Sequence, residues 1–217
     1  MDPLRNVTLV RHGTVRFEAE DGPVVYVDPF QLEKEPHDAD LIIVTHAHPD
    51  HFSPEDLRRA ARPDTCFVSI APVLAWLEKE MGVAAPYLNL VGPASPELFF
   101  ECGVMLAPLP AENKNHPAGA GFGALLGLGG FTYYVAGDTD LLADVPCDVL
   151  FVPCDGVYNM TDYLAKVPAQ LARLDHKPGV VVPYHYAGYI EGTDQNGPRL
   201  VQALNSLGFP AKLLIGR

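Results

Sequence analysis

Residues 41–51 read LIIVTHAHPDH, an unbroken apolar run followed at once by three histidines and an aspartate. The apolar run has the length and composition of a strand that is buried on both faces. The polar residues after it, His46, His48, Asp50 and His51, are ligand types that suit zinc, manganese or iron. A chance occurrence of H-x-H-x-D-H is expected in roughly one such chain in a thousand. The pattern therefore favours a metal site at a strand end over a His-rich surface turn.

Three further polar residues stand where loops leave the scaffold. His116 lies in a polar, Gly-rich loop, and Asp138 and His185 each follow an apolar, strand-like run. A catalytic metal takes three or more protein ligands, so one loop rarely completes a site. Because a rigid scaffold positions the loops at strand ends, we expect all these residues to share one pocket.

Short apolar or alternating segments, punctuated by 21 prolines and 19 glycines, predict a chain that mixes strands with helices. The predicted strands are Val7–Arg11, Thr14–Glu18, Val24–Val27, Leu41–Thr45, Cys66–Ile70, Leu98–Glu101, Val104–Leu109, Gly121–Leu128, Phe131–Ala136, Val149–Val152, Val180–Val182 and Ala211–Leu214. The predicted helices are Pro54–Ala61, with Ser53 as its N-cap, Ala71–Met81, Asp162–Leu174 and Asn196–Leu207. This order indicates an α/β layered fold, and the even composition indicates a single domain over residues 1–217.

The composition argues against several classes of partner and location for this protein. The 217 residues are enough to bury a core without disulfides. The net charge of −12 argues against nucleic acid and against an anionic membrane surface as partners. Neither a membrane-spanning run nor a signal peptide is visible, so we expect a cytoplasmic protein that does not bind membranes. The four cysteines form no C-x-x-C pair, and we expect them to stay reduced and to pack as small apolar groups.

Taken together, these motifs resemble the metallo-β-lactamase superfamily of metal-dependent hydrolases, and in particular its ascorbate-6-phosphate lactonase-like branch. Five short motifs carry the resemblance in the family's order: V-D-P at 27–29, H-x-H-x-D-H at 46–51, the loop histidine at 116, G-D-T-D at 137–140 and P-x-H at 183–185. The chain departs from the family at residues 52–54, where FSP replaces the glycine of many relatives, and DGVYNM at 155–160 matches the branch loosely. These departures leave the substrate open.

The resemblance implies a four-layer αββα sandwich, an α/β (α+β) fold with its site at one edge of the sheets. Carried over residue by residue, it assigns His46, His48 and His116 to one metal, Asp50, His51 and His185 to a second, and Asp138 to a bridge between them. It implies two divalent ions per chain, with zinc or alternatively manganese, and a bridging water or hydroxide that attacks a lactone, ester or phosphoester of a small molecule. Asp50 and Asp138 are the expected catalytic residues, and Asp50 is placed to exchange a proton. A homo-oligomer is compatible with the sequence.

Five other residues flank these motifs and are candidates for orienting a ligand or contacting substrate: His12, Asp28, Asn113, Lys114 and Tyr184. For each of them an ordinary turn or core role is the alternative.

Two other functions stay open at this point. The segment LVRHGT at 9–14 resembles the opening of histidine phosphatases, in which His12 would accept a phosphoryl group beside Arg11 and Gly13. A metal-binding or regulatory module without turnover is the second alternative, since a fold does not by itself establish catalysis.

Overall fold

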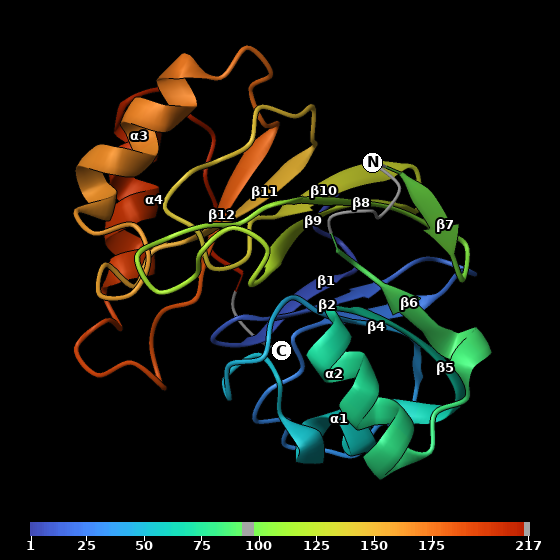
Figure 1. Cartoon of the computed structure of the whole chain (residues 1–217). Coiled ribbons are helices and arrows are strands. Elements are labelled where there is room, and N and C mark those ends of the chain that lie inside the picture. The colour runs from blue at the N-terminus through green and yellow to red at the C-terminus, as the bar shows by residue number, and fades with distance from the viewer. Residues whose placement is uncertain (93–97, 215–217) are drawn as a thin grey trace.

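The computed structural model describes residues 1–92 and 98–214, which contain two six-stranded sheets packed face to face (Figure 1). The first sheet has the order β1 (Val7–Arg11), β2 (Thr14–Glu18), β3 (Val24–Val27), β4 (Ala39–Val44), β5 (Ala61–Ser69) and β6 (Leu88–Leu90). The second has the order β12 (Val180–Tyr184), β11 (Val149–Pro153), β10 (Phe131–Val135), β9 (Phe122–Leu128), β8 (Val104–Pro110) and β7 (Phe99–Glu101).

Both sheets are mixed in the same way. In the first, β1 to β3 pair antiparallel and β3 to β6 pair parallel. In the second, β7 to β10 pair antiparallel and β10 to β12 pair parallel. Parallel neighbours end at the same edge of a sheet, so the loops after β3 and β4 lie together, as do those after β10, β11 and β12. A β-bridge between His46 and Gly121 joins the two sheets at this edge.

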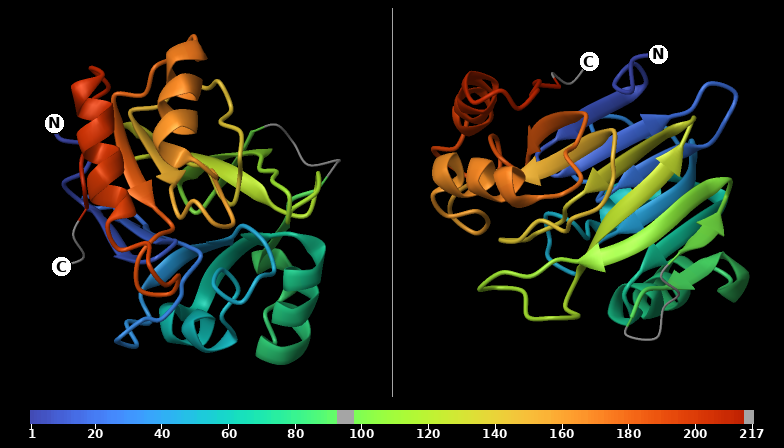
Figure 2. Two further views of the ribbon diagram at one scale, coloured as in Figure 1. Left: turned by 90° about the vertical axis from the view of Figure 1, so that its left-hand side faces the viewer. Right: turned by 90° about the horizontal axis from the view of Figure 1, so that it is seen from above.

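Helices cover the outer faces of the sheets. They are α1 (Pro54–Ala60) and α2 (Ala71–Trp76) on the first sheet, and α3 (Tyr163–Arg173) and α4 (Asn196–Ser206) on the second. Figure 2 shows α3 and α4 side by side, on the face of the second sheet that points away from the first. The expected αββα sandwich is therefore confirmed.

The apolar run of β4 is explained by burial on both faces. Leu41 and Ile43 point into the core between the sheets, whereas Ile42 packs beneath α1 and α2 with Leu57. Because side chains alternate across a strand, a strand between two layers must be apolar at every position. The strand is thus rigid where the histidine loop leaves it.

The start of α1 matches its sequence signal. The Ser53 hydroxyl accepts a hydrogen bond from the backbone N–H of Asp56, and Pro54 follows as the first helical residue. This cap fixes the chain directly after His51.

Several expected elements differ in the structure. The predicted strand Ala211–Leu214 is wrong: Ala211 forms only an isolated bridge to Val181, because Pro183, the next residue of β12 that would donate to this segment, has no N–H. The predicted helix 71–81 is α-helical only to Trp76 and continues as a π-helical turn, Leu77–Met81. The short strand β6 was not predicted, since its three residues carry too little pattern. In the described ranges, no helix is long and apolar enough to cross a membrane.

Candidate metal centre

The residues with metal-ligand chemistry converge where the parallel strands of both sheets end. His46, His48, Asp50 and His51 follow β4, and His185 follows β12. The loop after β10 contributes Asp138, and the loop between β8 and β9 contributes His116. These positions are up to 139 residues apart in the chain, from His46 to His185. The fold brings together all seven residues that the sequence assigned to the metals.

The first group consists of His46, His48 and His116, whose ligand atoms all lie within 4.8 Å of one another. Nδ1 of His48 is 2.9 Å from Nε2 of His116. Nε2 of His46 is buried and has no hydrogen-bond partner. Three imidazole nitrogens therefore point at one position.

The second group surrounds a neighbouring position. Nε2 of His51 and Nε2 of His185 are 3.0 Å apart, and each is within 3.2 Å of Oδ1 of Asp138. Oδ2 of Asp50 lies 3.5 Å from Nε2 of His185 and 3.7 Å from Nε2 of His51. Asp138 also converges with His46 and His51, so it lies between the two groups.

These contacts fit bound cations better than direct hydrogen bonds. Two imidazole nitrogens that face each other form a hydrogen bond only if one of them carries a proton and the other does not. Such facing nitrogens occur at both positions, in the pairs His51–His185 and His48–His116, and a bound cation would satisfy both nitrogens of each pair. Nε2 of His46 is buried without a hydrogen-bond partner, and buried Oδ1 of Asp138 has only the ring nitrogens of His51 and His185 beside it. Tetrahedral ligands at zinc-like bond lengths lie about 3.4 Å apart, close to the spacing of the second group.

Each buried histidine of the two groups has its other ring nitrogen fixed by a neighbour. Nδ1 of His51 lies 2.7 Å from Oδ2 of Asp28, and Nδ1 of His185 lies 3.1 Å from Oδ2 of Asp155. The remaining contacts are His116 Nδ1 to Asn113 Oδ1 at 2.9 Å and His46 Nδ1 to Thr45 Oγ1 at 3.0 Å. Such partners set the tautomer and the orientation of a metal-binding imidazole.

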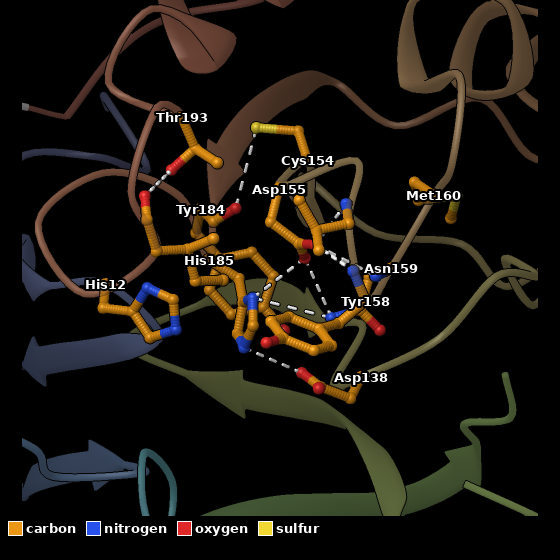
Figure 3. A network of polar contacts seen from close by, with 12 residues as sticks. His12, Asp138, Cys154, Asp155, Tyr158, Asn159, Met160, Tyr184, His185 and Thr193 are labelled. Atoms are coloured by element: carbon orange, nitrogen blue, oxygen red, sulfur yellow. Dashed lines mark hydrogen bonds and ion pairs between the residues drawn. The ribbon is translucent and has the colours of Figure 1, made fainter. Parts of the chain in front are cut away.

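A polar network links the two sides of the centre, and Figure 3 shows its part around Asp155, Asn159 and His185. Asn159 donates to Oδ2 of Asp155 at 3.0 Å, and its own Oδ1 accepts from Asn113 at 2.6 Å. The other carboxylate oxygen of Asp155 accepts the backbone N–H groups of residues 157, 158 and 159. The partner of His185 is therefore coupled to the partner of His116.

Burial and neighbouring charges shift the pKa values in opposite directions. Burial is the main reason why the pKa of His46 falls to about 2. For His185, burial alone would lower the pKa, but Asp138, Asp155 and Asp50 raise it to about 9. For Asp50 burial acts in the opposite direction and would raise the pKa, yet hydrogen bonds with His12 and His185 hold that pKa well below its usual range. The carboxylates thus place strong negative charge at the second position, which favours a cation there.

Three residues of the site hold left-handed backbone conformations. The φ angles of His12, Asp28 and His185 are 48°, 48° and 53°. Residues other than glycine rarely adopt such conformations, and they concentrate at functional sites. The backbone N–H of His185 donates to the carbonyl of His12 at 2.9 Å, which ties two of these turns together.

The flanking candidates separate into two classes. His12, Asp28 and Asn113 contact ligand residues directly. Lys114 is exposed and donates from Nζ to the carbonyl of Val157. Tyr184 is fully buried in the core between the sheets, so its side chain is not accessible to a substrate.

Sequence reasoning missed Asp155 as a partner of His185. Its signal was available, because Asp155 follows the apolar run of β11 just as Asp138 follows β10.

Comparison with known proteins identifies the family. Residues 6–101 match the model of the beta-lactamase superfamily domain. The chain is 30% identical over 195 residues to a UPF0173 metal-dependent hydrolase of Thermococcus kodakarensis, an alignment that covers 80% of this chain and 82% of the relative. The chain belongs to the UPF0173 metal-dependent hydrolase family. It is thus a metal-dependent hydrolase of the metallo-β-lactamase superfamily, as its homologues are named.

Solved structures share the fold of this UPF0173 hydrolase. Igni18, described as a metallo hydrolase from Ignicoccus hospitalis, superimposes with a TM-score of 0.70 at 24% identity, covering 97% of this chain and 95% of that one. A Parabacteroides distasonis protein gives a TM-score of 0.73 at 23% identity, with 97% and 93% covered.

The histidine-phosphatase alternative finds no support in this family. Arg11 is exposed and lines a cavity of about 670 Å³ with Arg16 and Tyr26, whereas His12 is buried against the metal ligands. His12 is therefore engaged with Asp50, a residue of the second ligand group.

Proposed function

We propose that this hydrolase holds two divalent cations and uses them to hydrolyse a lactone or a related ester of a small molecule. The observation that carries the proposal is the position of Asp138 between two separate groups of ligand atoms. One ion at each position, with Asp138 shared, would account for all seven residues. When bound, the two cations would make a water molecule acidic enough to attack at neutral pH and would polarise the substrate carbonyl or phosphoryl oxygen.

Asp50 is the carboxylate best placed to handle the proton. Its side chain is 15% exposed, compared with 6% for Asp138, so it lies on the open side of the centre. Like any aspartate it is ionised at neutral pH, and in this proposal it takes a proton from the attacking water and gives it to the leaving group. His12, whose Nε2 lies 3.3 Å from Oδ2 of Asp50, holds that carboxylate in place.

The lactone assignment rests on the resemblance to the lactonase-like branch, and the rim of the site is compatible with it. Val157 and Tyr158 follow Asp155 with exposures of 46% and 50%, and Tyr189 follows His185 with 47%. Lys114 adds a cation beside Val157. This combination suits a substrate with an apolar part and a single anionic group. The net charge of −12 again argues against nucleic acid.

Zinc is the first choice of metal and manganese the second. The centre offers imidazole and carboxylate ligands, which both ions accept.

Metal content of matched variants tests the proposal. We expect His48→Ala and His185→Ala each to hold about one ion fewer than the wild type after reconstitution with manganese or zinc. The double variant His48→Ala, Asp138→Ala should hold about two fewer. His176→Ala removes an exposed histidine outside the centre and should change nothing. Equal metal content in wild type and double variant would overturn the dinuclear centre.

Activity is tested separately on a panel of lactones, carboxylic esters and phosphodiesters. Lactone turnover that is abolished by chelation and restored by the metal supports the substrate assignment. Turnover of phosphodiesters alone would keep the metal centre and overturn the lactone.

A further inference from the structure

A second cluster of metal-ligand side chains lies away from the catalytic centre. It consists of Cys66 in β5, Glu101 at the end of β7 and Cys102 in the turn between β7 and β8. The two sulfur atoms and a carboxylate oxygen all lie within 4.8 Å of one another. Figure 1 shows β5 and β7 at the side of the sandwich opposite α3 and α4. The spacing in the sequence does not predict this cluster, because Glu101 lies 35 positions after Cys66.

The cluster joins the two sheets. Cys66 belongs to the first sheet and points into the core between the sheets, where it is 6% exposed. Glu101 and Cys102 belong to the edge hairpin of the second sheet and are partly exposed. A ligand bound by all three residues would therefore link the sheets and still be reachable from solvent.

Cys102 occupies an unusual position for a cysteine. The hairpin turn consists of Cys102 and Gly103, with φ angles of 48° and 77°. Two left-handed residues form a turn that Asn, Asp and Gly occupy with the least strain. The cysteine is therefore not the residue that the turn itself favours, and its thiol is directed to Glu101 and Cys66.

The polar contacts within the cluster are weak. Sγ of Cys102 lies 3.5 Å from Oε1 of Glu101, and a thiol is a poor hydrogen-bond donor. Burial and the neighbouring groups raise the pKa values of both thiols. Without a cation the two thiols are thus neutral groups beside a carboxylate.

We propose that Cys66, Cys102 and Glu101 bind a thiophilic divalent cation of the zinc class. Two thiolates and one carboxylate provide three of the four ligands of a tetrahedral zinc-like site, and water completes it. Each thiol releases its proton when the cation binds. The site lies outside the catalytic centre and stabilises the contact between the sheets, so it is independent of the function proposed above.

Cobalt titration of the full chain tests the site, because thiolate ligands give cobalt(II) an intense charge-transfer band in the near ultraviolet and the His/Asp centre contains no thiolate. The protein is stripped of metal, kept reduced and titrated without oxygen. We expect the band to saturate at one cobalt per chain at this site. Cys66→Ser and Cys102→Ser should lose it, and Glu101→Gln should weaken cobalt binding at least about tenfold. The matched control Cys147→Ser should retain it.

Three results would overturn the proposal. One is the absence of the band in the reduced wild type, and another is its persistence in Cys66→Ser. The third is a Cys66–Cys102 disulfide, identified by peptide mapping after exposure to oxidised glutathione, in a protein whose reduced form shows no band. Cys66→Ser is also expected to hold one zinc fewer while metal-dependent hydrolysis continues.

Discussion

Nε2 of His12 lies 3.3 Å from Oδ2 of Asp50, and the His12 ring lies 4.0 Å, centroid to centroid, from the ring of His185. His12 therefore contacts two residues of the second ligand group although the sequence placed it in a different motif. We propose that it holds Asp50 in the orientation that the centre requires.

Replacing His12 tests this role. We expect His12→Ala to lower metal affinity at the second position by roughly 10- to 100-fold, as loss of an outer partner of a metal ligand does. His12→Asn keeps a side-chain N–H and should lose less. Calorimetric titration with the metal measures the affinity of both variants, and His37→Ala, at an exposed histidine, is the control. Phosphatase turnover that survives chelation and disappears in His12→Ala would instead support phosphoryl transfer through His12 as the function.

Asp155 gives a second prediction, on a residue that only the structure identified. Its carboxylate is 3.1 Å from Nδ1 of His185 and receives a further bond from Asn159. Asp155→Asn removes the negative charge that orients His185, so metal affinity should fall by roughly 10- to 100-fold. Asp175→Asn, at an exposed carboxylate, is the control. Unchanged affinity in Asp155→Asn would show that the contact is not needed for metal binding.

A third prediction concerns the bridge between the sheets. A Cβ atom on Gly121 would lie 2.9 Å from Cβ of His46 and 3.3 Å from the carbonyl oxygen of Thr45. Gly121→Ala should therefore displace His46 and lower the free energy of unfolding by about 1–3 kcal/mol. Gly92→Ala, where an added Cβ meets no atom of the described residues within 4 Å, is the matched control. Denaturant unfolding and metal content are measured for both variants. Equal stability and equal metal content in the two variants would contradict the close approach of Gly121 to His46.

Metal removal gives the fourth prediction. The centre draws residues from both sheets, so cations held there would bind the folded chain and not the unfolded one. With free metal at about 1,000 times the dissociation constant, each ion should add about 4 kcal/mol to the free energy of unfolding. Thermal unfolding with and without a chelator measures this, and the double variant His48→Ala, Asp138→Ala should respond much less. An identical response in that variant would place the stabilising metal outside the His/Asp centre.

Local sequence determined the elements that depend on neighbours in the chain. The apolar run of β4 and the capped start of α1 are both short-range patterns, and the structure contains both. The histidines that follow β4 share one loop, so their proximity needed no tertiary information. His116, Asp138 and His185 were expected beside them because they stand where loops leave the scaffold, and the resemblance assigned them to particular metals.

Only the tertiary structure decided which distant side chains meet. Asp155 reaches His185 because β11 and β12 pair in parallel and the chain leaves both strands at the same edge of the sheet. Cys66 reaches Cys102 because β5 of the first sheet packs beside the β7–β8 turn of the second. The sequence positions of these pairs carry no periodic signal. Pairing of strand ends depends on the order of strands in the sheets and on packing between the sheets, and these are set by burial over the whole chain.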